Sequence, residues 1–277
     1  MPDRGYANPH LLWTPAELCA RLSDPKLCVI DVRSTADYVR GHVPGAGHLD
    51  IYGISLCDTR AEPLAAFSWM VSYLMQNRGV DLDKTVVFYQ ENSGWRAARG
   101  FWFLEYFGHE DVHVLDGGFN AWRAAGFPVS VEPVEVSRTR FEAKGEASRV
   151  ATAKDILHHL GKEDVKVVDT RSDEEYTGKL VRAARGGAIP HAIHLEWAHN
   201  LDSNGCYKSA AELKAMYEGR GITPDKEIIP YCHGGYRSAH TYLALRLLGY
   251  PRVRNYLGSW KEWGDREDLP IERPSTP

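Results

Sequence analysis

The stretch Val29-Ile-Asp-Val-Arg-Ser34 is written a second time, almost unchanged, as Val167-Val-Asp-Thr-Arg-Ser172. A second run, Val86-Val-Phe-Tyr89, returns as Ile228-Ile-Pro-Tyr231. The two copies of each run lie about 140 residues apart, and a period of that length indicates duplicated domains rather than a solenoid of short repeats. The chain has 277 residues, which is enough for two domains of ordinary size.

Each copy alternates short apolar runs with helical patterns. The β-branched runs 29–32, 86–89 and 112–115 are typical of buried parallel strands, and residues 94–107 have helical spacing that ends at Gly108. We therefore predict an α/β fold of two tandem domains, each a parallel sheet with helices on both faces. The predicted units are a first domain over 14–130, a charged linker over 131–148 and a second domain over 149–273.

Composition narrows the functional classes. The hydrophobic share of 43% and the charged share of 25% are ordinary for a globular protein, and the net charge of −4 argues against nucleic acid as a partner. No apolar run approaches the roughly 20 residues that span a bilayer, and residues 1–15 lack the pattern of a secretory signal, so we expect no membrane association and a cytoplasmic location. The five cysteines are widely spaced without a C-x-x-C pair, and no Walker or dinucleotide glycine motif occurs, so we expect no disulfide framework, no metal and no cofactor.

The chemistry is predicted to lie in the loop that follows the strand-like run 228–231. A helix that starts after this loop presents unpaired N–H groups and a partial positive charge, and glycines allow successive N–H groups to converge on an anion. A nearby arginine adds a permanent positive charge. All three favour a cysteine thiolate over the thiol. We predict Cys232 as the nucleophile, and the substrate-binding cradle as His233, Gly234, Gly235, Tyr236 and Arg237.

The spacing of this loop argues against a phosphatase. Cysteine-dependent phosphatases use C-x5-R, whereas Cys232 and Arg237 are separated by four residues and Ser238 occupies the sixth position. Serine cannot hold a phosphate through two parallel bonds as arginine does. The matching loop of the first copy, residues 90–96, has no thiol, so we predict a non-catalytic first domain that closes the cleft; a separate binding role for it stays open.

With these residues in view, the chain resembles the two-domain rhodanese family, and within it the bacterial thiosulfate sulfurtransferases. The motifs that carry the resemblance are Asp31-Val-Arg33, Asp169-Thr-Arg171, Gly41-His-Val-Pro-Gly-Ala46, Gly117-Gly-Phe-Asn-Ala-Trp122 and Gly258-Ser-Trp-Lys-Glu-Trp-Gly264. One departure is His191, which stands in the second-copy turn 187–192 where the family usually has glycine. For the Asp169 and Arg171 pair we favour a structural role.

The resemblance implies a sulfur relay. The sulfane sulfur of thiosulfate would move to Cys232 as a persulfide and then to a thiophilic acceptor, cyanide or a thiol, in ping-pong order. The implied partners are this small donor and acceptor, with a protein thiol such as thioredoxin as one candidate acceptor. Arg185, just before the second-copy turn, would reach across the cleft to the substrate. Two alternatives stay open: a 3-mercaptopyruvate sulfurtransferase, and a persulfide carrier or binding module fed by a partner protein.

Overall fold

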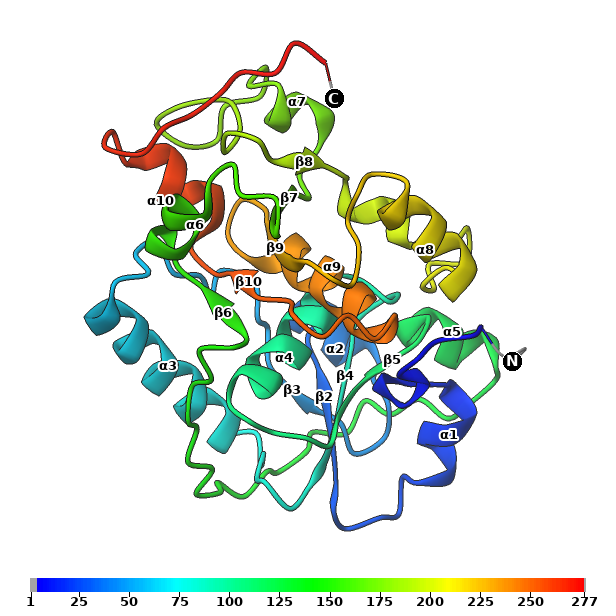
Figure 1. The fold of residues 1–277 in the computed structure, drawn as a ribbon. Coiled ribbons are helices and arrows are strands. Elements are labelled where there is room, and N and C mark those ends of the chain that lie inside the picture. Colours follow the sequence, from blue (N-terminus) through cyan, green and yellow to red (C-terminus); the bar gives the residue numbers. More distant parts are fainter. Residues whose placement is uncertain (1–3, 277) are drawn as a thin grey trace.

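Two parallel sheets, one from each half of the chain, form the framework of the protein (Figure 1). The computed structural model describes residues 4–276. The first sheet has the order β1-β5-β4-β2-β3, with every neighbouring pair parallel. Its strands are β1 (Leu12–Trp13), β2 (Leu27–Asp31), β3 (Gly47–His48), β4 (Thr85–Tyr89) and β5 (Val112–Leu115).

The second sheet repeats this arrangement. β8, β7 and β9 pair in parallel, β10 pairs with β6, and a parallel bridge between Ile228 and Val253 joins the two groups. The resulting order, β6-β10-β9-β7-β8, matches that of the first sheet strand for strand. Its strands are β6 (Val150–Ala151), β7 (Val165–Asp169), β8 (Ile193–His194), β9 (Glu227–Tyr231) and β10 (Asn255–Tyr256).

Helices cover both faces of each sheet, because alternate strand residues point to opposite sides and both sides are apolar. Along β2, Val29 joins the core under α1 and α5, whereas Ile30 joins the core under α3 and α4. The second sheet is covered in the same way, by α6 and α10 on one face and by α8 and α9 on the other. The predicted α/β class is therefore confirmed. The helices are α1 (Pro15–Ala20), α2 (Thr35–Arg40), α3 (Ala61–Gln76), α4 (Trp95–Tyr106), α5 (Gly118–Ala124), α6 (Ala153–His159), α7 (Asp173–Tyr176), α8 (Ala210–Glu218), α9 (Tyr236–Leu247) and α10 (Ser259–Asp265), with 3-10 turns η1 (Pro9–Leu11) and η2 (Trp197–Asn200).

The two halves meet along α4 and α9, which lie side by side at the centre of the molecule (Figure 1). One apolar core cluster includes buried residues of both helices, so the core is continuous across this contact. Polar groups also join the halves: the Tyr242 hydroxyl donates to Glu105 at 2.5 Å, and the His240 ring contacts the carbonyl oxygen of Ser93 at 2.8 Å. Because α9 starts at the predicted nucleophilic loop, this contact places the first domain directly behind that loop.

The Asp169 and Arg171 side chains form a buried pair at the end of β7. Arg171 donates to Asp169 at 2.9 Å and to the carbonyl oxygen of Gly187 at 2.7 Å, and the Tyr231 hydroxyl donates to Asp169 at 2.5 Å. Neither side chain lines a cavity at the sulfur-bearing loop. The pair ties the strand end to the following turn, which confirms the predicted structural role.

The segment 131–148, which we propose as the linker, contains no helix or strand. It follows the outside of α3, where Ser72 and Gln76 donate to the carbonyl oxygen of Phe141 and the Phe141 ring is buried. Over residues 4–276, no helix is long and apolar enough to cross a membrane.

Candidate active site around Cys232

The Cys232 side chain stands where β9 ends and the chain turns into α9. Its Sγ is almost completely buried, and it accepts a hydrogen bond from the backbone N–H of Gly235 at 3.1 Å. The Ser238 hydroxyl lies 3.7 Å from the same sulfur. The sulfur therefore faces the donors at the start of the helix, as the sequence predicts.

Only the second of the two loop glycines is required by the backbone. Gly235 has a φ of +83°, and a Cβ at this position would lie 2.4 Å from Nη1 of Arg99 and 2.8 Å from the carbonyl oxygen of Leu257. Gly234 lies outside the left-handed region, and a Cβ there would meet Ser55 at an ordinary 3.7 Å. The turn that directs the Gly235 N–H to Cys232 therefore requires glycine at position 235. Gly234 is not required by the turn, and it lines the cavity opposite Ser55 of the first domain.

Charges and hydrogen bonds favour the thiolate of Cys232. Burial raises the pKa of the thiol, but the Arg237 guanidinium and hydrogen bonds from Ser238 and Gly234 outweigh burial, so the net pKa shift is downward. A thiolate is the form that attacks sulfur, so the site is prepared for nucleophilic chemistry.

Arg237 is held by a carboxylate that the sequence analysis did not single out. Its guanidinium makes two bonds to Glu175, at 2.5 and 2.9 Å, and only 3% of the Glu175 side chain is exposed. Burial raises the pKa of Glu175, but its bonds to Arg237 and the charge of Arg237 lower the pKa to about 2. Glu175 is therefore ionised at neutral pH, and it both orients Arg237 and offsets part of its positive charge.

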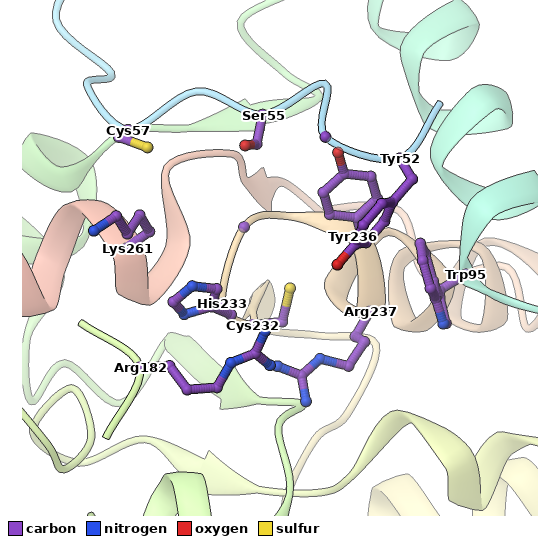
Figure 2. Close-up of a pocket in the computed structure, with 12 residues that line it drawn as sticks. Tyr52, Ser55, Cys57, Trp95, Arg182, Cys232, His233, Tyr236, Arg237 and Lys261 are labelled. Carbon is purple, nitrogen blue, oxygen red and sulfur yellow. The ribbon is translucent and has the colours of Figure 1, made fainter. Parts of the chain in front are cut away.

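The sulfur opens into a cavity of about 530 Å³ between the two domains (Figure 2). Such a volume falls in the range of small-molecule sites. The second domain contributes the loop, and the first domain contributes a segment that begins at Tyr52 together with Trp95. The described lining contains three cations and no carboxylate. The lining residues are Tyr52, Gly53, Ser55, Cys57, Trp95, Arg182, Cys232, His233, Gly234, Tyr236, Arg237 and Lys261.

The predicted substrate-binding residues of the loop differ in what they contact. His233, Gly234, Tyr236 and Arg237 line the cavity, while Gly235 contributes its N–H to the sulfur. Burial and the nearby charge of Arg182 lower the pKa of His233 to about 4, so its ring is neutral at pH 7. His233 can therefore contact an anion through its backbone and ring, but it brings no positive charge.

Arg185 is not part of the cavity wall, which corrects the expectation that it reaches the substrate. Its guanidinium donates to backbone carbonyls around the end of α10, including those of Gly264 at 3.1 Å, Trp263 at 3.0 Å and Leu269 at 3.0 Å. Carbonyls at the end of a helix lack i+4 partners, and Arg185 supplies donors to these groups at and just beyond the end of α10. Arg182, three residues earlier, lines the cavity instead and also lies 3.4 Å from Glu175.

In the matching loop of the first domain, the Gln90 side chain occupies the position that an anion would take at the start of α4. Oε1 of Gln90 accepts hydrogen bonds from the backbone N–H groups of Arg96 at 2.7 Å and Ala97 at 3.4 Å. The amide oxygen thus occupies the N-terminus of α4, where an anion would otherwise bind. This loop has no thiol, and Gln90 takes up two of the N–H donors at the start of α4.

Sequence reasoning missed the carboxylate of Glu175 and the cation of Lys261. It predicted that the first domain closes the cleft, but it did not identify the residues of that wall, which begins at Tyr52. None lies in the 232–237 loop, and none forms a motif with it. The repeat carried a signal for Glu175, because Tyr38 of the first copy matches Tyr176 of the second and Glu175 lies one position before it. In the structure Glu175 is buried in α7, the short helix after Asp169-Thr-Arg171.

Comparison with known proteins identifies the family of the chain. The rhodanese-like domain model matches residues 14–125 and again 152–266. The chain is 36% identical to the thiosulfate sulfurtransferase of Azotobacter vinelandii, over 96% of this chain and 98% of the relative. It is 38% identical to the sulfur carrier protein TtuD of Thermus thermophilus, over 97% and 99%. Among solved structures, the 3-mercaptopyruvate sulfotransferase SseA of Escherichia coli superposes with a TM-score of 0.78 at 29% identity, over 91% and 99%.

Proposed function

The chain belongs to the rhodanese-like family of sulfurtransferases, and we propose that its donor is thiosulfate, whose sulfane sulfur it carries as a persulfide on Cys232. The observation that carries the proposal is the buried Cys232 sulfur, which accepts the Gly235 N–H at 3.1 Å and opens into a cavity lined by cations. We also propose that the catalytic domain is the unit 149–273, and that the unit 14–130 supplies the opposite wall of the cavity.

The first half-reaction is a displacement on sulfur. The Cys232 thiolate attacks the outer sulfur of thiosulfate, a new S–S bond forms, the old S–S bond breaks, and sulfite leaves with the bonding pair. The persulfide keeps the single negative charge that the thiolate carried, so the N–H of Gly235 and the charge of Arg237 stabilise both states. Thiosulfate and sulfite are dianions, and the cations in the cavity wall favour binding of such species.

The second half-reaction returns the thiolate. A thiophilic acceptor, cyanide or a thiolate, attacks the outer sulfur of the persulfide, and the Cys232 thiolate leaves. For cyanide the product is thiocyanate. Because donor and acceptor use the same cavity in turn, the order is ping-pong. Arg182 replaces Arg185 as the proposed contact to the donor, since it reaches the cavity and remains 46% exposed.

The test is to incubate the protein with thiosulfate alone, remove small molecules and record the intact mass. We expect the mass of one added sulfur atom, which cyanide removes. The Cys232→Ser variant should gain nothing. Cys57 lines the same cavity and offers a matched control, because the Cys57→Ser variant should load as the parent does.

The result also separates the other family chemistries. Loading from 3-mercaptopyruvate but not from thiosulfate would replace the proposed donor. Loading only from a protein persulfide would indicate a carrier of the kind that the name of the Thermus relative describes. Equal loading of the parent and the Cys232→Ser variant would refute the assignment of the nucleophile.

A further inference from the structure

Arg99 is a fully buried cation that the first domain presents to the sulfur-bearing loop of the second. It lies on α4, and its Nη1 donates to the carbonyl oxygen of Gly235 at 2.7 Å. Its guanidinium carbon lies 4.9 Å from the centre of the Tyr236 ring. Across residues 4–276 no carboxylate comes within ion-pair distance of it. Buried charges are normally paired, so this lone cation requires an explanation.

The group that Arg99 holds is directly connected to the Cys232 sulfur. Gly235 donates its N–H to Sγ, and its carbonyl oxygen accepts from Arg99 and, at 3.2 Å, from Nδ2 of Asn255. With both polar groups of one residue held, the turn cannot rotate its N–H away from the sulfur. Counted along this path, the Arg99 charge lies within roughly 10 Å of the sulfur, and at an effective dielectric constant near 20 this is enough to shift a pKa by about one unit.

The other charged groups that face Cys232 already have partners or reach solvent. The charge of Arg237 is offset by Glu175, and the His233 ring is neutral at pH 7. Arg182 and Lys261, at the cavity wall, are 46% and 42% exposed, so water screens them. Burial lowers the pKa of Arg99 to about 10, so its guanidinium is charged at pH 7. It has no carboxylate partner among the described residues, which leaves the sulfur anion as its natural counter-charge.

We propose that Arg99 is a positioning residue for the sulfur-transfer site: it fixes the Gly235 turn and stabilises the negative charge on Cys232, first as thiolate and then as persulfide. This inference rests on the proposed role of Cys232 as nucleophile. It gives the first domain a share in the chemistry although that domain has no thiol of its own in the matching loop. The relay between donor and acceptor would then depend on both copies of the repeat.

Two variants separate charge from hydrogen bonding. Arg99→Gln keeps a donor for the Gly235 carbonyl but removes the charge, and Arg99→Lys keeps a positive charge on a single ammonium group. The rate of iodoacetamide alkylation of Cys232 is measured between pH 5 and 10, with Cys57→Ser as the common background so that the exposed thiol does not react. Arg246→Gln is the matched control, because Arg246 lies in the same contact between α4 and α9 but pairs with Glu105 at 3.1 Å. Thermal unfolding of each variant verifies that it is folded.

We expect Arg99→Gln to raise the midpoint of the alkylation profile by about one pH unit, which lowers the rate about tenfold below the midpoint. Arg99→Lys should stay within about a third of a unit of the parent, and Arg246→Gln should not move the midpoint at all. Identical profiles for Arg99→Gln and the parent would overturn the proposal, as would an equal shift in Arg246→Gln. If Arg99→Gln does not fold, a midpoint for Arg99→Lys shifted upward by a full unit would also overturn it. The profile needs no sulfur donor, so failure of the thiosulfate loading test is a separate result.

Discussion

A single methyl group at Gly235 should disable the sulfur site, whereas the same methyl group one residue earlier should not. In the Gly235→Ala variant the new Cβ would occupy a left-handed conformation at φ +83° and lie 2.4 Å from Nη1 of Arg99 and 2.8 Å from the Leu257 carbonyl oxygen. The left-handed backbone costs an L-residue about 1–2 kcal/mol, and overpacking a full site adds about 1–3 kcal/mol. The loop must shift to relieve this, because neither neighbour is the far end of a flexible, exposed side chain.

The shift should be visible in the reactivity of the thiol. Moving the Gly235 N–H away from Cys232 removes a hydrogen bond to an ionised group, which is worth about 1.5–3 kcal/mol, or about one to two pKa units. We therefore expect the alkylation profile of Gly235→Ala to move to higher pH by that amount and its free energy of unfolding to fall by about 2–5 kcal/mol.

The control is Gly234→Ala, whose Cβ would meet Ser55 at 3.7 Å without a positive φ. Its unfolding free energy should stay within about 0.5 kcal/mol of the parent, and its alkylation midpoint should not move. Equal shifts in the two variants would refute the reasoning, because they would mean that the turn at Gly235 does not set the thiol pKa.

Three further outcomes follow from the geometry. Arg185→Met should lower the unfolding free energy by about 2–4 kcal/mol, because it removes the donors to the carbonyls at the end of α10, and it should leave the KM for thiosulfate unchanged. Arg182→Met should raise that KM about threefold with little effect on stability, because Arg182 lines the cavity. The reversed pattern would restore Arg185 as the contact to the sulfur donor. The pKa of Glu175 is lowered to about 2, so its ion pair with Arg237 contributes stability that is complete above about pH 5 and is lost as the pH falls through 2. In urea unfolding, the free energy of unfolding of Glu175→Gln should be about 3 kcal/mol below that of the parent at pH 7, and the difference should shrink toward pH 2. A difference that does not vary with pH would contradict the pairing. His191 is exposed and has a φ of +62°, which strains the backbone of an L-residue. His191→Gly should remove this strain and raise the unfolding free energy by about 0.5–1 kcal/mol. A fall would show that the His191 ring makes a contact worth more than the backbone strain.

The sequence was most informative where the site is local. The residues 232–237 are contiguous, and a strand end, a glycine turn and a helix start predict backbone donors at one sulfur, as the Gly235 N–H provides. The pattern does not show that Gly235 alone needs the left-handed turn, or that the His233 ring is neutral at pH 7. The first residue of α9 is harder to predict. The sequence shows only that a helix follows the loop, and the helix begins at Tyr236 directly after Gly235, which offers no side-chain cap to recognise.

The other residues of the site, Arg99 and Glu175 among them, are distant in sequence from the loop 232–237. The contact of Arg99 with Gly235 spans 136 residues, and that of Glu175 with Arg237 spans 62. No local pattern reports such pairings. Arg182 and Arg185 lie in one irregular segment without periodicity, so only the position of the α10 carbonyls decides which of the two turns away from the cavity.

The shared core between α4 and α9 has a consequence for how the duplication can be inherited. Two copies of a fold are ordinarily separable, and a copy without a nucleophile could be deleted at little loss. Here the inner faces of both sheets contribute to one apolar cluster, so a gene truncated to the half with Cys232 would expose that half of the core to water. The copy without a nucleophilic cysteine is thereby retained as a permanent folding partner, and neither copy can be exchanged by recombination without the other.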